Sequence, residues 1–161
     1  MTRVARLLAL PEANVFGFGV LVNYPWELLQ TPLFQGMSTA PHFEATRVCT
    51  LAAIGDGALL VAAFWAAAAA ARSRHWLLYP RVRDVLTLML VGQALNVALE
   101  WLNTEVWHRW AYAPVMPIVP LLGTGLAPFL QWLLLPPLVV AIVRRQLHGE
   151  LALAGRGGSR G

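Results

Sequence analysis

The chain has 161 residues, of which 58% are hydrophobic and only 12% are charged, and its mean hydropathy is +0.58. Soluble domains carry about 25% charged residues, so this composition excludes an ordinary soluble protein and predicts an all-α integral membrane protein. All 12 basic residues are arginines that flank apolar segments rather than forming a patch among aromatic side chains, which argues against nucleic-acid binding.

Four apolar segments are each long enough for a bilayer crossing, which takes about 20 residues. We expect spans at residues 13–34, 45–71, 84–103 and 118–143, within a single transmembrane domain of residues 1–148. A disordered basic tail is expected at residues 149–161. No cleavage site of small residues follows the first apolar run, so we expect a retained helix rather than a signal peptide.

The arginines are distributed unevenly between the two sides of these spans. One side carries Arg3, Arg6, Arg72, Arg74, Arg81, Arg83, Arg144, Arg145, Arg156 and Arg160. The other side carries only Arg47 and Arg109. By the positive-inside rule both termini are cytoplasmic, and the predicted architecture is a four-helix bundle in a bacterial inner membrane.

The first predicted span contains a polar stretch, Asn23 to Glu27, with Pro25 inside it. A charged side chain at the centre of a bilayer costs at least about 2.5–3.5 kcal/mol, so such residues usually face a bundle interior or a cavity. Pro25 removes one backbone hydrogen bond and should kink the helix where neighbouring helices can satisfy the freed carbonyl. We therefore expect this stretch to point inward.

The other three spans each carry polar residues near the middle. Asp56 lies between two glycines in the second span, Asn96 and Glu100 repeat the Asn-x-x-x-Glu spacing in the third, and Gln131 lies in the fourth. At about 1.5 Å of rise per residue, Glu27, Asp56, Glu100 and Gln131 fall at similar heights. The sequence thus predicts a polar site in the bundle core.

Two interpretations of this site are open. In the functional one, Glu27, Glu100 and Asp56 are catalytic acids that donate or relay a proton. In the structural one, the same groups form hydrogen bonds that hold the helices together. Substrate contacts are assigned to Asn23, Trp26, Asn96, Trp101 and Gln131. The two asparagines are expected to orient the glutamates one turn away, and the two tryptophans to line a pocket.

Residues 23–27, Asn-Tyr-Pro-Trp-Glu, resemble the Asn-x-x-Trp-Glu pattern of the integral-membrane terpene cyclases of fungal meroterpenoid and indole-diterpene pathways. In that family a membrane-embedded Glu and a second acid protonate an epoxide or alkene to start cyclisation. The resemblance implies Glu27 as the first acid and either Glu100 or Asp56 as the second. Those cyclases are longer and have more spans.

Residues 107–132 are more loosely similar to the membrane lycopene cyclase domain, through Trp110-x-Tyr112 and Pro128-x-x-Gln131-Trp132. A doubled acid usually follows the proline in that domain. Here Phe129 and Leu130 stand in its place.

The sequence therefore predicts a membrane-embedded, acid-catalysed cyclase or isomerase of the terpene or carotenoid type, acting on an isoprenoid or similar lipid. Such chemistry needs no cofactor, no metal site is expected from the Cys and His spacing, and a homo-oligomer is possible. Two alternatives remain open: a small carrier or channel subunit that binds a proton or cation, and a non-catalytic membrane accessory protein.

Overall fold

The computed structural model describes residues 10–158, with residues 154–158 described by their backbone only. Four long helices dominate: α2 (Pro11–Gln30), α3 (His42–Ala71), α4 (Val82–Trp101) and α5 (Leu126–Gly158). The π-helical turn η4 (Leu102–Val106) extends α4, and the connections contain the 3-10 turns η1 (Thr31–Leu33), η2 (Met37–Thr39) and η3 (Trp76–Leu78). The described residues form no strand beyond two isolated bridges, so the prediction of an all-α fold is confirmed.

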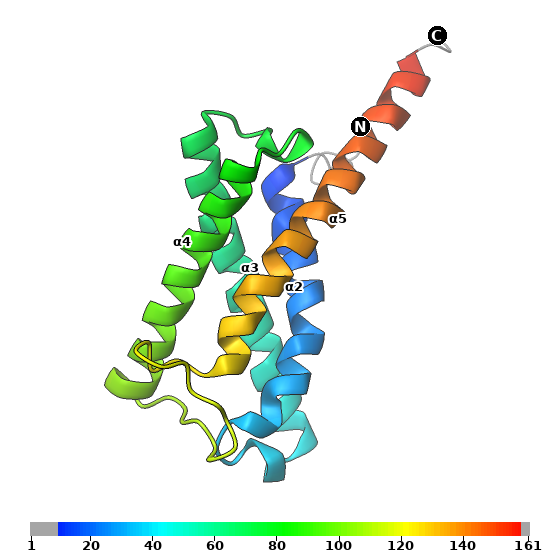
Figure 1. Cartoon of the computed structure of the whole chain (residues 1–161). Coiled ribbons are helices and arrows are strands. Elements are labelled where there is room, and N and C mark those ends of the chain that lie inside the picture. Colours follow the sequence, from blue (N-terminus) through cyan, green and yellow to red (C-terminus); the bar gives the residue numbers. More distant parts are fainter. Residues whose placement is uncertain (1–9, 159–161) are drawn as a thin grey trace.

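The four helices form an antiparallel bundle in which each packs against two neighbours (Figure 1). Helix α2 packs against α3 and α5, and α4 packs against the same two helices from the other side. Helix α2 begins and α5 ends at the same end of the bundle, while the long connection between α4 and α5 covers the opposite end (Figure 1). This arrangement gives every helix an inward face.

Three of these helices, α3, α4 with its η4 extension, and α5, are long and apolar enough to cross a membrane. Helix α2 is not among the helices that are long and apolar enough. The prediction of four apolar spans is therefore confirmed for the second, third and fourth spans and not for the first. The physical reason is that α2 carries Asn14, Asn23 and Gln30, all of which are buried in the bundle. Its polar residues point toward its neighbours and lower its mean hydropathy.

The boundaries of the fourth helix differ from the predicted span. Helix α5 begins at Leu126 instead of residue 118, because residues 118–125 form a tight turn with a bridge between Ile118 and Gly125 and with Gly123 at a φ of 69°. The predicted disordered tail is wrong for residues 149–158, which continue α5. Its central residues, 150–154, are the strong helix formers Glu, Leu and Ala, which continue the helix although glycines flank them. Residues 159–161 lie outside the described part.

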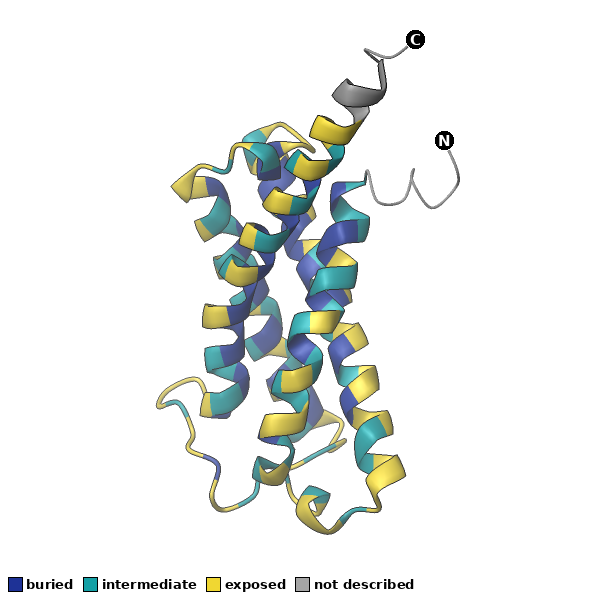
Figure 2. Cartoon of the chain, turned by 90° about the vertical axis from the view of Figure 1, so that its right-hand side faces the viewer, coloured by how far each residue is buried: buried dark blue, intermediate teal, exposed yellow. Residues whose placement is uncertain are grey.

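Two close contacts of small residues let the helices approach each other. A Cβ atom on Gly19 of α2 would lie 2.9 Å from Leu60 Cδ1 and 3.4 Å from Gly57 Cα on α3. A Cβ atom on Gly92 of α4 would lie 2.4 Å from Cζ3 of Trp132 on α5. The buried faces of all four helices meet along the axis of the bundle (Figure 2), and these glycines set the spacing there.

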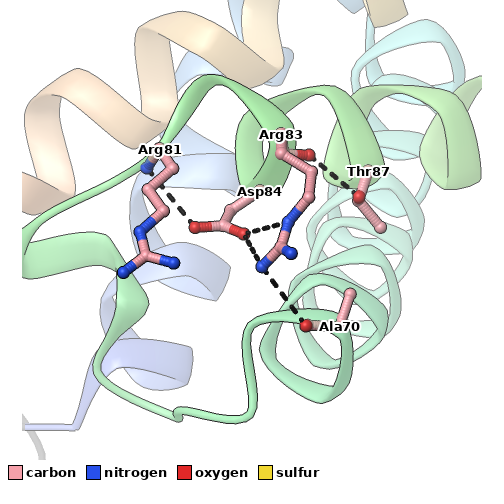
Figure 3. A network of polar contacts seen from close by, with 5 residues as sticks. All are labelled: Ala70, Arg81, Arg83, Asp84 and Thr87. Carbon is pink, nitrogen blue, oxygen red and sulfur yellow. Dashed lines mark hydrogen bonds and ion pairs between the residues drawn. The ribbon is translucent and has the colours of Figure 1, made fainter.

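Asp84 organises the start of α4 and ties it to the end of α3 (Figure 3). Its carboxylate is buried, accepts the Arg81 backbone N–H at 3.4 Å and pairs with the Arg83 guanidinium at 3.1 Å. Arg83 also donates to the carbonyl of Ala70 on α3 at 3.4 Å. An acidic side chain at a helix N-terminus is favourable because of the helix dipole.

Candidate functional site: a carboxylate–amide cluster in the bundle

The side-chain amide of Gln131 on α5 is the centre of the polar cluster. Its Nε2 atom lies 2.8 Å from Asn23 Oδ1 and 2.9 Å from Glu27 Oε1, both on α2. The same nitrogen lies 2.8 Å from Asp56 Oδ2 on α3. One amide therefore joins three helices, as predicted for a site in the bundle core.

The α2 side of the cluster follows from helical spacing. Residues 23, 27 and 30 are four and three positions apart, which places them on one face of a helix. Gln30 Nε2 donates to Glu27 Oε1 at 2.8 Å and to Gln131 Oε1 at 3.3 Å. Asn23 Nδ2 donates to the Gly19 carbonyl at 2.8 Å, which turns the Asn23 oxygen toward Gln131.

The cluster holds two acids and no cation. Among residues 10–153 the ion pairs involve Glu12, Glu44 and Asp84 only, so no basic side chain neutralises Glu27 or Asp56. The Gln131 amide nitrogen carries two hydrogens, yet three acceptor oxygens lie within hydrogen-bond distance of it. The cluster is therefore short of both positive charge and hydrogen-bond donors.

Glu100 lies apart from this hydrogen-bonded group. It is buried on α4, and the Tyr112 hydroxyl, from the connection between α4 and α5, donates to its Oε2 atom. Glu27 is nevertheless close enough to Glu100 for the two carboxyl groups to interact electrostatically. The four polar residues expected at one level thus divide into a trio on α2, α3 and α5 and a separate Glu100–Tyr112 pair.

The predicted substrate contacts have mixed outcomes. Asn96 is buried, but its Nδ2 donates to the Pro128 carbonyl at 3.2 Å, so the expectation that it orients Glu100 is wrong. Trp101 is 55% exposed, and whether it lines a pocket stays a prediction. Residue 101 lies about 100° around the helix from the inward-facing Glu100.

Trp26, by contrast, is half-buried on α2. Its indole N–H is buried and has no hydrogen-bond partner among the described residues. Whether it lines a pocket stays a prediction.

Sequence reasoning missed the roles of Tyr112 and Gln30. Tyr112 fits the pattern of an aromatic belt at a membrane interface, yet its hydroxyl bonds a buried acid. No local signal marks this contact. Gln30 lies one turn after Glu27, and this helical spacing was a signal that could have placed it in the acid site.

Two surface depressions, of about 360 and 460 Å³, lie along the C-terminal half of α5. None of Glu27, Asp56 and Glu100 lines either of them. In the described part of the chain, no group of three His, Cys, Asp or Glu residues is arranged to hold a metal ion.

These features define the class of the protein: an all-α bundle with three helices apolar enough to cross a membrane and a pair of unneutralised acids between its helices. Neither protein-family models nor curated proteins or solved structures gave a match to the chain.

Proposed function

We propose that the protein is an integral membrane protein whose Glu27–Asp56 pair holds a proton and transfers it to an isoprenoid or similar lipid, as an acid-catalysed cyclase or isomerase. The observation that carries the proposal is that both acids share one amide donor and have no cation beside them. Two neighbouring carboxyl groups in an apolar setting do not both ionise readily, so the pair retains a proton. A retained proton makes one of the two a carboxylic acid.

Within this proposal Glu27 is the donor and Asp56 accepts the proton back, while Gln131 fixes the geometry of both. An alkene protonated on carbon becomes a carbocation, and an epoxide protonated on oxygen gives one when its C–O bond breaks. Asp56 then takes a proton from a carbon next to the cation, a double bond forms there, and the proton passes back to Glu27. The acid is thus regenerated without an external cofactor. Glu100 lies within electrostatic range of Glu27, so its charge would stabilise the carbocation.

The membrane setting is supported by the three apolar helices and by the arginines. The connection between α3 and α4 lies at the end of the bundle where α2 begins and α5 ends (Figure 1). Arg72 follows the last residue of α3, Arg81 and Arg83 stand at the start of α4, and the pair 144–145 lies in the C-terminal half of α5. By the positive-inside rule this end faces the cytoplasm of a bacterial inner membrane, and both termini lie on that side.

The decisive variant is Glu27→Gln, which is nearly isosteric but cannot act as an acid. Washed membranes, which no longer synthesise lipid, would be prepared from cells that express the wild type, Glu27→Gln, or the control Glu105→Gln, whose side chain is exposed. The membranes would be incubated in heavy water before their lipids are extracted. The expected product is present with the wild type and Glu105→Gln and missing with Glu27→Gln. It carries solvent deuterium on carbon if the substrate is protonated at an alkene, and no such deuterium if an epoxide is protonated on its oxygen. Identical lipid profiles for all three, and for cells without the gene, would refute the proposal.

A second candidate, a non-catalytic accessory protein, is favoured by one observation: the acids are hydrogen-bonded to neighbours and neither main depression reaches them. Replacing an acid that has no cationic partner by its amide then removes the cost of its charge, so the Glu27→Gln/Asp56→Asn double variant should unfold at a higher temperature than the wild type. If the double variant unfolds at a higher temperature and its cells have the same lipid profile as cells with the wild type, the accessory role is supported over the catalytic one.

A further inference from the structure

The C-terminal half of α5 presents two arginines without acidic partners beside two hollows. Arg144 and Arg145 are exposed and take part in none of the ion pairs of the described residues. By contrast, Arg47, Arg74 and Arg83 are each paired with an acid.

Arg145 lines two hollows. One, of about 360 Å³, lies between α2 and α5 and is lined by Phe18, Ile142, Arg145 and Gln146. The other, of about 460 Å³, is lined by Ala141, Arg144, Arg145 and His148. The first combines the apolar side chains of Phe18 and Ile142 with the Arg145 guanidinium, and the second is lined mainly by basic side chains.

The second hollow has a fixed wall. His148 Nε2 donates to the carbonyl of Leu78 in η3 at 3.1 Å, and the His148 ring packs edge-on against Tyr79 with ring centroids 5.8 Å apart. The nearest acid along the helix, Glu150, accepts a hydrogen bond from Gln146 at 3.2 Å. The positive charge of the two arginines is therefore left for a ligand.

We infer that this surface binds the head group of an anionic phospholipid from the surrounding bilayer, with its phosphate at Arg144 and Arg145 and its first acyl carbons against Phe18 and Ile142. The inference rests on the membrane setting proposed above. A phosphate matches two guanidinium groups, and basic pockets between helices on the cytoplasmic side of membrane proteins bind anionic head groups. A soluble anion would make no use of the apolar wall.

The site is separate from the acid cluster. Arg145 follows Gln131 by fourteen residues, which is about 21 Å along a helix. Binding here would fix the depth and tilt of α5, the helix that carries Gln131 to the two acids.

The test is native mass spectrometry of the full chain in detergent, titrated with phosphatidylglycerol and, separately, with phosphatidylcholine. We expect retained phosphatidylglycerol adducts and few phosphatidylcholine adducts. Arg144→Gln/Arg145→Gln should weaken phosphatidylglycerol binding on the order of thirtyfold, the factor that two basic side chains near an anionic surface provide. The matched control, Arg47→Gln/Arg109→Gln, removes the same charge at the opposite end and should bind as the wild type does.

Equal binding of both lipids would overturn the inference, and so would an equal loss of phosphatidylglycerol affinity in the two double variants. Displacement of phosphatidylglycerol by millimolar inorganic phosphate would also overturn it, because it would indicate a soluble anion as the ligand. All variants should keep wild-type helix content, measured by circular dichroism. Glu27→Gln should bind phosphatidylglycerol as the wild type does. A failed lipid-binding test therefore says nothing about the acid pair, which the heavy-water experiment tests by itself.

Discussion

Replacing Gly92 by alanine tests the contact that positions the acid site. A Cβ at this position would lie 2.4 Å from Cζ3 and 2.6 Å from Cε3 of Trp132. Carbon atoms normally pack about 3.5–4.0 Å apart, so the indole or the whole of α5 must move by about 1 Å. Trp132 is only 2% exposed, and its ring has little room to move aside.

The expected cost is that of overpacking a core, about 1–3 kcal/mol. For a chain of this size each kcal/mol lowers the midpoint of thermal unfolding by about 2–4 °C, so Gly92→Ala should unfold roughly 2–12 °C below the wild type. The assay is thermal unfolding in detergent followed by circular dichroism. Because Gln131 precedes Trp132, the same variant should also weaken the activity assigned to the acid pair.

The matched control is Gly55→Ala on α3, where a new Cβ meets nothing within 4 Å. Alanine is favoured over glycine in a helix interior by about 0.5–1 kcal/mol, so this variant should be more stable than the wild type. If Gly92→Ala were stabilised as much as Gly55→Ala, the close packing of α4 on Trp132 would be refuted.

Two further predictions concern the ends of α4. Burial, and after it the Glu100 carboxylate, raises the pKa of the Tyr112 phenol above its ordinary value of 10.0. Because the phenol then ionises more readily in the unfolded chain than in the folded one, the free energy of unfolding should decrease as the pH rises above 10. The ionisation of the tyrosines can be followed by absorbance, and Tyr112→Phe should remove the part of the titration at highest pH. If that part remained in the variant, the hydrogen bond from Tyr112 to Glu100 would be contradicted. Asp84→Ala removes the buried acid at the start of α4 and should lower the free energy of unfolding by about 1–2 kcal/mol. Asp84→Asn should recover part of this loss. Equal thermal stability of the wild type and both variants would contradict the capping role of Asp84.

Much of the fold could be predicted from local patterns. The high apolar content and the long uninterrupted segments indicated helices of membrane-spanning length, and three of the four have it. Polar groups avoid hydrocarbon, and this rule predicted that Asn23, Glu27, Asp56 and Gln131 lie inside the bundle. In the structure the amide of Gln131 is hydrogen-bonded to the other three residues.

The partners of the inward-facing residues could not be predicted in this way. Gln131 bonds residues that are 108, 104 and 75 positions away, so its partners depend on how three helices are rotated about their axes. Spacing within one helix suggested Asn96 as the partner of Glu100. Tyr112, from a connection with no regular pattern, bonds it instead, and Asn96 bonds a backbone carbonyl on α5.

The sequence by itself determined that the chain is helical and which faces carry polar groups, because hydropathy and helical periodicity are local properties. Only the tertiary structure decided that Glu27 and Asp56 share one amide, that Glu100 is bonded by Tyr112, and that Trp101 points outward. Helix rotation and close approach depend on packing contacts such as Gly92 against Trp132, which join residues distant in the chain.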